Sequence, residues 1–173
     1  MKLKKIVLSI STLLLIGGNT YAADVVGSGN ISTGSMEVSS ILSPGCHLST
    51  TNFGFGNLLP NFVNGNTYST ARLLITCTKT TPYDISLDTG YSNDYSKRTM
   101  IGSLPGNNDR LSYNVYPTLP FGSIIGDGTS GTIVISEIGR GEVTIKNIYA
   151  KIYPQTYITP DTYRDVLTIK LTY

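Results

Sequence analysis

The sequence is poor in the residues that build metal sites and nucleic-acid sites. Its 173 residues include one histidine, His47, and two cysteines, too few for the usual nitrogen and sulfur ligands of a zinc site. The 13 Lys and Arg residues form no cluster beyond the amino terminus, whereas nucleic-acid binding depends on clustered positive charge. We therefore expect no metal, no other cofactor and no nucleic-acid partner.

Catalytic motifs are also missing. The chain has no nucleophile elbow and no phosphate-binding loop. A secreted glycosidase would need two facing carboxylates, and Asp84 and Asp88 are a candidate pair. The alternation of the surrounding residues directs both outward from a strand, where solvated carboxylates are common. The sequence therefore predicts a protein that is not an enzyme.

Long hydrophobic runs are limited to the amino terminus. The first 22 residues, MKLKKIVLSISTLLLIGGNTYA, combine three lysines with an apolar run that is too short to span a bilayer. Small residues at Thr20 and Ala22 predict a signal peptide that is cleaved after Ala22. Removing the three lysines lowers the 13 basic residues to 10, against 11 acidic ones, so the exported chain has a net charge of about −1.

The two cysteines, Cys46 and Cys77, belong to a chain that is expected to be exported. In an oxidising compartment, two cysteines most simply form one disulfide. The alternative is a metal site, which the single histidine and the lack of a second cysteine pair disfavour. The sequence thus predicts a Cys46–Cys77 disulfide.

Short alternating patterns separated by turn residues fill the rest of the chain. In TARLLITCT, alternate residues from Ala71 to Cys77 share one face, and PYDISLD, RLSYNVY and TIVIS alternate in the same way. About seven such segments, without a helical period, predict an all-β sandwich. Residues 89–109 are interpreted as a polar connection, and a switch of apolar parity near Lys146 and Asn147 predicts a β-bulge or a bend.

Alternating patterns also lie close to both ends of the exported chain. One face of residues 34–42 carries Gly34, Met36, Val38, Ser40 and Leu42, after a Gly- and Ser-rich leader. One face of the terminal segment carries Leu167, Ile169, Leu171 and Tyr173. The first pattern could be an ordinary first strand of the domain. The second is a strand with no successor in the sequence to pair with it.

Six segments occur together in an order that resembles the spore coat U domain family, which includes the pilin subunits of archaic chaperone-usher pili. They are CHLSTTNFGFGN, LLITCTKTTPYDISLDTG, RTM, RLSYNVYP, FGSIIGDGTSG and DTYRDVLTIKLTY, and the match covers residues 34–173. Two departures are visible. Asp161 stands where members commonly have glycine, which we interpret as local variation in a turn, and the leader ADVVGSGNIS is longer than usual.

The resemblance implies an immunoglobulin-like sandwich that lacks its final strand and so exposes a groove. In such subunits a periplasmic chaperone lends a strand to the groove, and the amino-terminal segment of another subunit later replaces it. Here the resemblance implies a donor strand with Gly34, Met36, Val38, Ser40 and Leu42, and a groove wall with Leu167, Ile169, Leu171 and Tyr173. It also implies that the Tyr173 carboxylate is a handle for the chaperone.

The resulting plan has a signal peptide at residues 1–22, a leader with the donor segment at 23–45, and a pilin domain at 46–173. The expected function is a shaft or adaptor subunit of a surface fibre that serves attachment or biofilm formation, with a chaperone, an outer-membrane usher and other pilin subunits as partners. The alternative is a secreted coat or surface protein that does not polymerise, or a sugar-binding module with the same domain.

Three smaller expectations concern single residues. The tyrosines, including Tyr91, Tyr95, Tyr116 and Tyr157, are expected to serve strand packing, with an adhesive or sugar-binding surface as the alternative. Asp127 in GDG is expected to lie in a turn and not to bind calcium. His47 is expected on the surface, on the face of its strand opposite Cys46.

Overall fold

The computed structural model describes residues 29, 31, 33–58 and 67–173. The predicted signal peptide and part of the leader lie outside the described residues. The chain divides into two compact units, Met1–Leu42 and Ser43–Tyr173, which are described separately.

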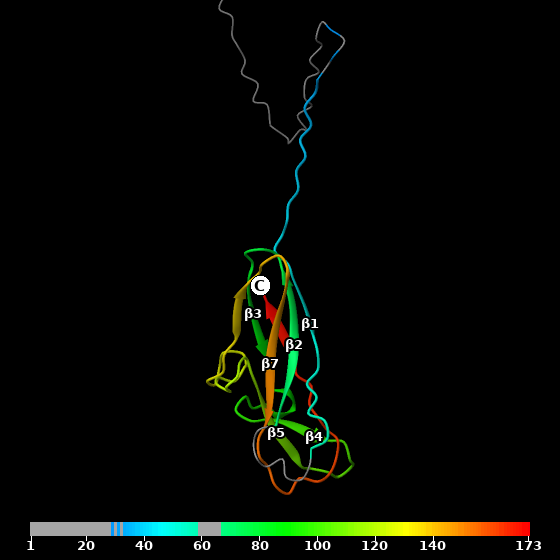
Figure 1. The fold of residues 1–173 in the computed structure, drawn as a ribbon, viewed down its shortest axis with the longest axis vertical. Coiled ribbons are helices and arrows are strands. Elements are labelled where there is room, and N and C mark those ends of the chain that lie inside the picture. Colours follow the sequence, from blue (N-terminus) through cyan, green and yellow to red (C-terminus); the bar gives the residue numbers. More distant parts are fainter. Residues whose placement is uncertain (1–28, 30, 32, 59–66) are drawn as a thin grey trace, which may run out of the picture. The chain divides into compact units, whose positions relative to one another are not determined.

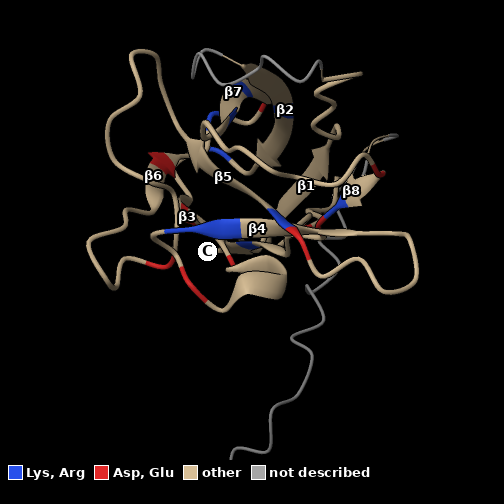
Figure 2. Ribbon diagram, turned by 90° about the horizontal axis from the view of Figure 1, so that it is seen from below, with Lys and Arg blue, Asp and Glu red and all other residues tan. Residues whose placement is uncertain are grey.

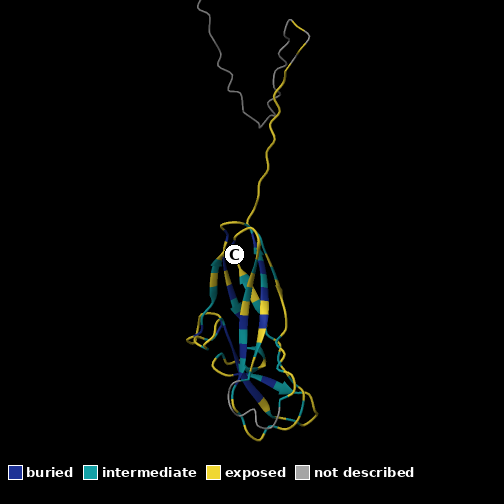
Figure 3. Cartoon of the chain, in the orientation of Figure 1, coloured by how far each residue is buried: buried dark blue, intermediate teal, exposed yellow. Residues whose placement is uncertain are grey.

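The described part of the first unit contains no strand or helix. Its apolar side chains are exposed: Met36 and Val38 by 89% each and Leu42 by 87%. Figure 3 shows this segment as continuously exposed. The alternating pattern of residues 34–42 is therefore not satisfied by a partner strand within the described chain.

The second unit is all-β, as predicted. Its strands are β1 (Cys46–Thr50), β2 (Tyr68–Cys77), β3 (Pro82–Leu87), β4 (Arg98–Gly102), β5 (Arg110–Tyr116), β6 (Ile135–Ile138), β7 (Val143–Ile152), β8 (Tyr163–Arg164) and β9 (Ile169–Thr172), with one 3₁₀ turn, η2 (Gly90–Ser92). Two strands were not predicted from the sequence: β4 lies within the stretch that was interpreted as a polar connection, and β8 precedes the alternating terminal segment.

The strands form two antiparallel sheets that pack as a sandwich. The six-stranded sheet has the order β1-β2-β7-β5-β4-β8, and the three-stranded sheet has the order β6-β3-β9. Figure 1 shows β1 beginning and β9 ending near the same end of the domain. The strand β1 lies at one edge of the larger sheet, and β9 lies at one edge of the smaller sheet.

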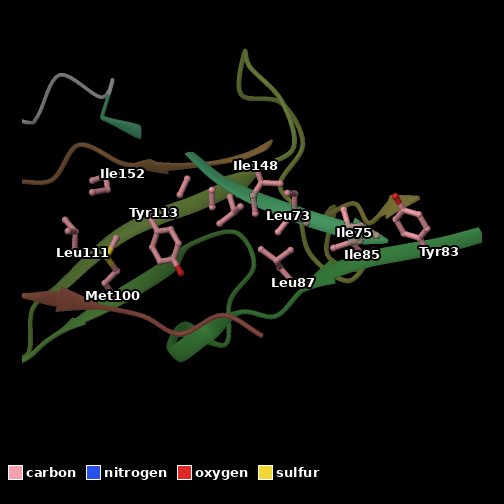
Figure 4. Close-up of a cluster of buried hydrophobic side chains, with 14 of the residues drawn as sticks. Leu73, Ile75, Tyr83, Ile85, Leu87, Met100, Leu111, Tyr113, Ile148 and Ile152 are labelled. Atoms are coloured by element: carbon pink, nitrogen blue, oxygen red, sulfur yellow. The ribbon is translucent and has the colours of Figure 1, made fainter. Parts of the chain in front are cut away.

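The core lies between the sheets and follows the predicted alternation. Leu73 and Ile75 of β2 and Ile85 and Leu87 of β3 are at most 1% exposed, and Figure 4 shows them within one cluster of buried side chains. Burying an aliphatic side chain of this size contributes about 1.5 to 3 kcal/mol. The strand pattern with a period of two is thus explained by burial of one face of each sheet.

The predicted β-bulge near Lys146 is wrong. The pairing of β7 with β2 is continuous from Tyr68↔Lys151 to Thr76↔Val143. The parity switch has another cause: Val143 and Ile145 face outward and are 58% and 59% exposed. Lys146 shares a face with buried Leu73 and forms an ion pair with Glu137 of β6, in the other sheet.

Charged residues otherwise lie on the surface of the domain. Figure 2 shows acidic and basic residues interspersed over the strands and loops. The exception is Arg98, which is completely buried.

The predicted disulfide is confirmed. Cys46 and Cys77 are bonded, and they also face each other in the ladder between β1 and β2. The bond ties the first strand of the domain to the core strand β2, since Cys77 is buried. No cysteine among the described residues is free.

Removing the disulfide should destabilise the domain without changing its fold. The bond closes a loop between residues 31 positions apart, for which chain entropy predicts a contribution of about 3 to 4 kcal/mol. We expect Cys46→Ala/Cys77→Ala to lower the free energy of unfolding in urea by about that amount. Wild-type protein under reducing conditions is the control. A difference below about 1 kcal/mol would contradict the assignment of this role.

Candidate functional site: an open groove between two sheet edges

One side of the site is the edge of β9 that has no neighbouring strand in the described sheet. The amide of Asp88 donates to the carbonyl of Thr168 at 3.1 Å, and the Thr168 amide donates to the Asp88 carboxylate at 3.0 Å. Both backbone groups of Thr168, the amide and the carbonyl, therefore point toward β3. Adjacent residues of a strand direct their backbone groups to opposite sides. The amides and carbonyls of Ile169 and Leu171 therefore point to the side where the described sheet has no further strand.

The opposite edge is formed by β1 and the segment that follows it. The Thr51 amide donates to the Arg72 carbonyl at 3.0 Å, and the Arg72 amide donates to the Thr51 hydroxyl at 2.8 Å. These bonds continue the attachment of the chain to β2 beyond the end of β1. Phe53 and Phe55 then pack their rings against the core.

A groove of about 1230 Å³ lies between these two edges. One side is formed by residues 50–58 and the other by residues 158–167 and Ile169. The lining includes apolar residues that belong to the core itself: Ala71, Leu87, Met100, Leu111, Ile148 and Ile152. The groove thus lies over the hydrophobic core, whose residues there are at most 8% exposed, and its partly buried apolar walls include Phe53, Phe55 and Leu167.

The four predicted wall residues occupy different positions. Leu167 and Ile169 line the groove, and Leu171 packs against the core beside them. Tyr173 is 60% exposed. It lines a separate hollow of about 420 Å³ together with Pro82 and Tyr83. Two of the four residues therefore line the groove, Leu171 packs against the core, and Tyr173 lies beyond the end of β9.

Two carboxylates hold the part of the wall that precedes β9. Residues 165–168, here called the crossing segment, connect β8 in one sheet to β9 in the other. Asp165 accepts hydrogen bonds from the Tyr91 amide at 3.0 Å and the Tyr113 hydroxyl at 2.6 Å.

Asp88 was expected to be a solvated carboxylate, and this is wrong. It is half-buried and accepts bonds from Gly90 and Thr168.

The buried Arg98 fixes the backbone behind this wall. Its Nε and Nη2 donate to the Asp88 carbonyl at 2.9 and 2.7 Å, Nη2 also donates to the Ile125 carbonyl, and Nη1 donates to Asn114. The guanidinium lies over the Tyr95 ring. Burial lowers the pKa of Arg98, but these partners satisfy the charged form. Sequence reasoning missed this residue because nothing local to it indicates burial.

The far end of the groove is held by two half-buried aspartates. Asp109 accepts bonds from the amide and hydroxyl of Thr159. Asp161, at the position of the first departure from the family pattern, accepts bonds from the Leu104 amide and Asn107. A Cβ on Gly102 would lie 2.5 Å from its carboxylate. Asp161 therefore joins the groove rim to the β4–β5 connection, a role that we did not predict.

The other candidate residues form no second site. Asp127 accepts bonds from the amide and hydroxyl of Thr129, as expected in a turn, and His47 is exposed. Tyr116 is buried and its hydroxyl bonds to that of Tyr153. The described residues contain no group of three or more potential metal ligands. Within the same part of the chain, no helix has the length and hydrophobicity needed to cross a membrane.

These features define a class of protein: a β-sandwich with an apolar groove between one edge strand of each sheet. The family model of the Spore Coat Protein U domain matches residues 32–170. The chain belongs to this family, which confirms the resemblance seen in its motifs.

A similar solved structure has the same fold. It is a chain in the crystal structure of the CsuC–CsuE chaperone–tip adhesion subunit pre-assembly complex from the archaic chaperone-usher Csu pili of Acinetobacter baumannii. The TM-score is 0.56 at 21% sequence identity. The match covers 75% of this chain and 40% of that chain. In a search of curated proteins, no sequence matches.

The pairing of Asp109 with Thr159 should make stability depend on pH in the acid range. Hydrogen bonds from the Thr159 hydroxyl and amide lower the pKa of Asp109 below 3.8. A carboxyl with a lowered folded-state pKa stabilises the fold above its unfolded-state pKa and loses that contribution as pH falls through the folded-state pKa. We expect Asp109→Asn to reduce the slope of unfolding free energy against pH below about pH 4. An unchanged slope would contradict this assignment.

Proposed function

We propose that the protein is a structural subunit of a chaperone-usher fibre, in which the groove of one copy takes the donor segment of another. The observation that carries this proposal is the apolar groove between β1 and β9. Its partly exposed apolar walls are unfavourable in water, and a strand that fills the groove gains both burial and ladder hydrogen bonds. Strand addition of this kind is an established mode of recognition.

The donor segment has the features that such a groove needs. Residues 34–42 contribute nine residues, about 30 Å when extended, to a wall of eight residues from Asp165 to Thr172. Met36, Val38 and Leu42 are exposed in the described chain and so are available. Their burial would contribute on the order of 5 to 9 kcal/mol, before the cost of ordering the segment.

The partners and the route follow from this role. We propose a signal peptide at residues 1–22, a leader with the donor segment at 23–45, and a pilin domain at 46–173. A periplasmic chaperone would occupy the groove first, with the Tyr173 carboxylate as its handle, and an outer-membrane usher would direct assembly into a surface fibre. The similar structure is a complex of a chaperone with a tip adhesion subunit, which supports this order of partners.

Head-to-tail exchange of strands produces an open filament and not a closed oligomer. A single domain with one groove and one donor suits a shaft or adaptor subunit, which would serve attachment or biofilm formation. In this proposal the protein binds and assembles but does not catalyse a reaction.

The donor segment can be tested with two adjacent residues of opposite parity. We expect Val38→Asp to abolish fibre assembly, because a carboxylate would have to enter the apolar groove. Ser39→Asp, on the other face of the segment, is the matched control and should assemble as the wild type does. Fibres are measured by electron microscopy and by polymer ladders in gels of cell-surface extracts, with the export machinery of the native host.

Two results would contradict this part of the proposal. One is normal fibres from Val38→Asp. The other is a wild-type protein that reaches the cell surface only as a monomer, which would favour a coat or surface protein that does not polymerise.

The groove wall can be tested in the same way on β9. Ile169 lines the groove, whereas Thr172 of the same strand is exposed. We expect Ile169→Asp to lower the amount of exported subunit and of fibre by more than about tenfold, which corresponds to the loss of one buried aliphatic side chain. Thr172→Asn, which adds no charge opposite its cross-strand partner Asp84, is the control. Equal amounts of fibre from both variants would show that the inward face of β9 has been misassigned.

A further inference from the structure

The crossing segment, residues 165–168, is a part of the groove wall that no strand ladder holds. It lies between β8 and β9 and is not itself part of a strand. Val166 and Leu167 in its centre are apolar and line the groove, and Val166 is 69% exposed. In water, such residues are driven toward the apolar floor next to them. Something must hold the segment out of the groove for the groove to stay open.

We propose that Asp88 and Asp165 are positioning residues that hold the crossing segment in the extended form that admits a donor strand. This proposal rests on the proposed function. Each carboxylate binds the backbone of the other's segment: Asp88 accepts from the Thr168 amide, and Asp165 accepts from the amide of Tyr91, three residues after Asp88. The crossing segment is therefore joined at both of its ends to the connection that follows β3.

A side chain of the core supports the contact between the two segments. The side chain of Tyr113, a residue of the groove floor, donates its hydroxyl hydrogen bond to Asp165 from the core side, and Figure 4 shows that hydroxyl on the side of the crossing segment. Burial, followed by the bond to Asp165, raises the pKa of Tyr113. Its hydroxyl therefore stays protonated and remains a donor at neutral pH.

Backbone geometry on the other side leaves room for Asp165. Gly90 has a φ of +60°, in the region that favours glycine. A Cβ at this position would lie 2.4 Å from the Asp165 carboxylate. Arg98 holds the Asp88 carbonyl through two hydrogen bonds. The contact between the two connections is thus supported from the core and cannot be formed with a larger residue at position 90.

The physical effect of losing a carboxylate follows from these contacts. In Asp165→Ala, the Tyr91 amide and the Tyr113 hydroxyl lose their acceptor. The crossing segment is then free to move, and its apolar side chains can cover the groove floor. A donor strand would have to displace them, so the rate of capture should fall. Once a donor is bound and its ladder is formed, the rate of release should change little.

The experiment uses the full mature chain carrying Val38→Asp, which keeps the groove but does not polymerise. A fluorescent peptide of residues 34–42 is the probe, and association and dissociation rates are measured separately. We expect Asp165→Ala to lower the association rate about tenfold, the effect of one charge-assisted hydrogen bond. Asp165→Asn should recover part of it, because the amide oxygen can still accept from Tyr91. Asp84→Ala, an exposed carboxylate on the same side of the chain as Asp88, should have no effect.

The outcomes separate this inference from the proposed function. If the Val38→Asp chain itself binds no peptide, the proposed function is wrong and the positioning role falls with it. If that chain binds but folded Asp165→Ala associates at the same rate, only the positioning role is overturned. A loss of thermal stability with an unchanged association rate would likewise leave Asp165 as a structural residue alone.

A milder variant covers the case in which Asp165→Ala does not fold. Tyr113→Phe keeps the ring in the core and removes only the hydroxyl bond. We expect its association rate to fall about threefold, less than in Asp165→Ala, because Asp165 keeps its bond from the Tyr91 amide. A rate equal to that of the parent chain would overturn the proposal.

Discussion

The structure depends on one constraint: an apolar groove separates β1 and β9, the edge strands of the two sheets. Core residues form the floor of this groove, which has a volume of about 1230 Å³. The edge of β9 carries unpaired backbone groups of Ile169 and Leu171. Apolar surface and unsatisfied ladder positions therefore occur together, and both are satisfied by the same kind of partner, an extended chain with alternating apolar side chains.

The groove must be kept open by interactions within the two sheets, without a strand bound in it. The disulfide fixes β1 to β2 on one side of the groove. On the other side, the buried Arg98 and the carboxylates of Asp88 and Asp165 connect segments from both sheets through backbone acceptors and donors. Every buried side-chain nitrogen and oxygen in the described residues has a hydrogen-bond partner. Directional polar contacts thus supply the rigidity that a closed hydrophobic core would otherwise give.

The features that could be predicted from the sequence are those that produce a pattern among neighbouring residues. Burial of one face of β2 and β3 produces an alternation that can be counted, and the two cysteines allow one pairing. The prediction failed at β7, where outward Val143 and Ile145 are apolar and inward Lys146 is charged, because an ion pair to β6 reverses the usual pattern. It also missed Arg98 and Asp165, whose partners lie up to 74 positions away. For Asp88, one local signal was present: the sequence Asp88-Thr89-Gly90 directly after β3 is typical of a turn in which the aspartate accepts a backbone hydrogen bond.

Amide hydrogen exchange at Ile169 and Leu171 tests the central claim most directly. In the monomeric chain, these two amides point to the unpaired side of β9 and should exchange quickly, whereas Lys170, which faces β3, should be protected. On assembly into fibres, a strand in the groove should slow exchange at Ile169 and Leu171 by at least about a hundredfold, as expected for amides in a stable ladder. Assembled fibres in which both amides still exchange as they do in the monomer would contradict the account.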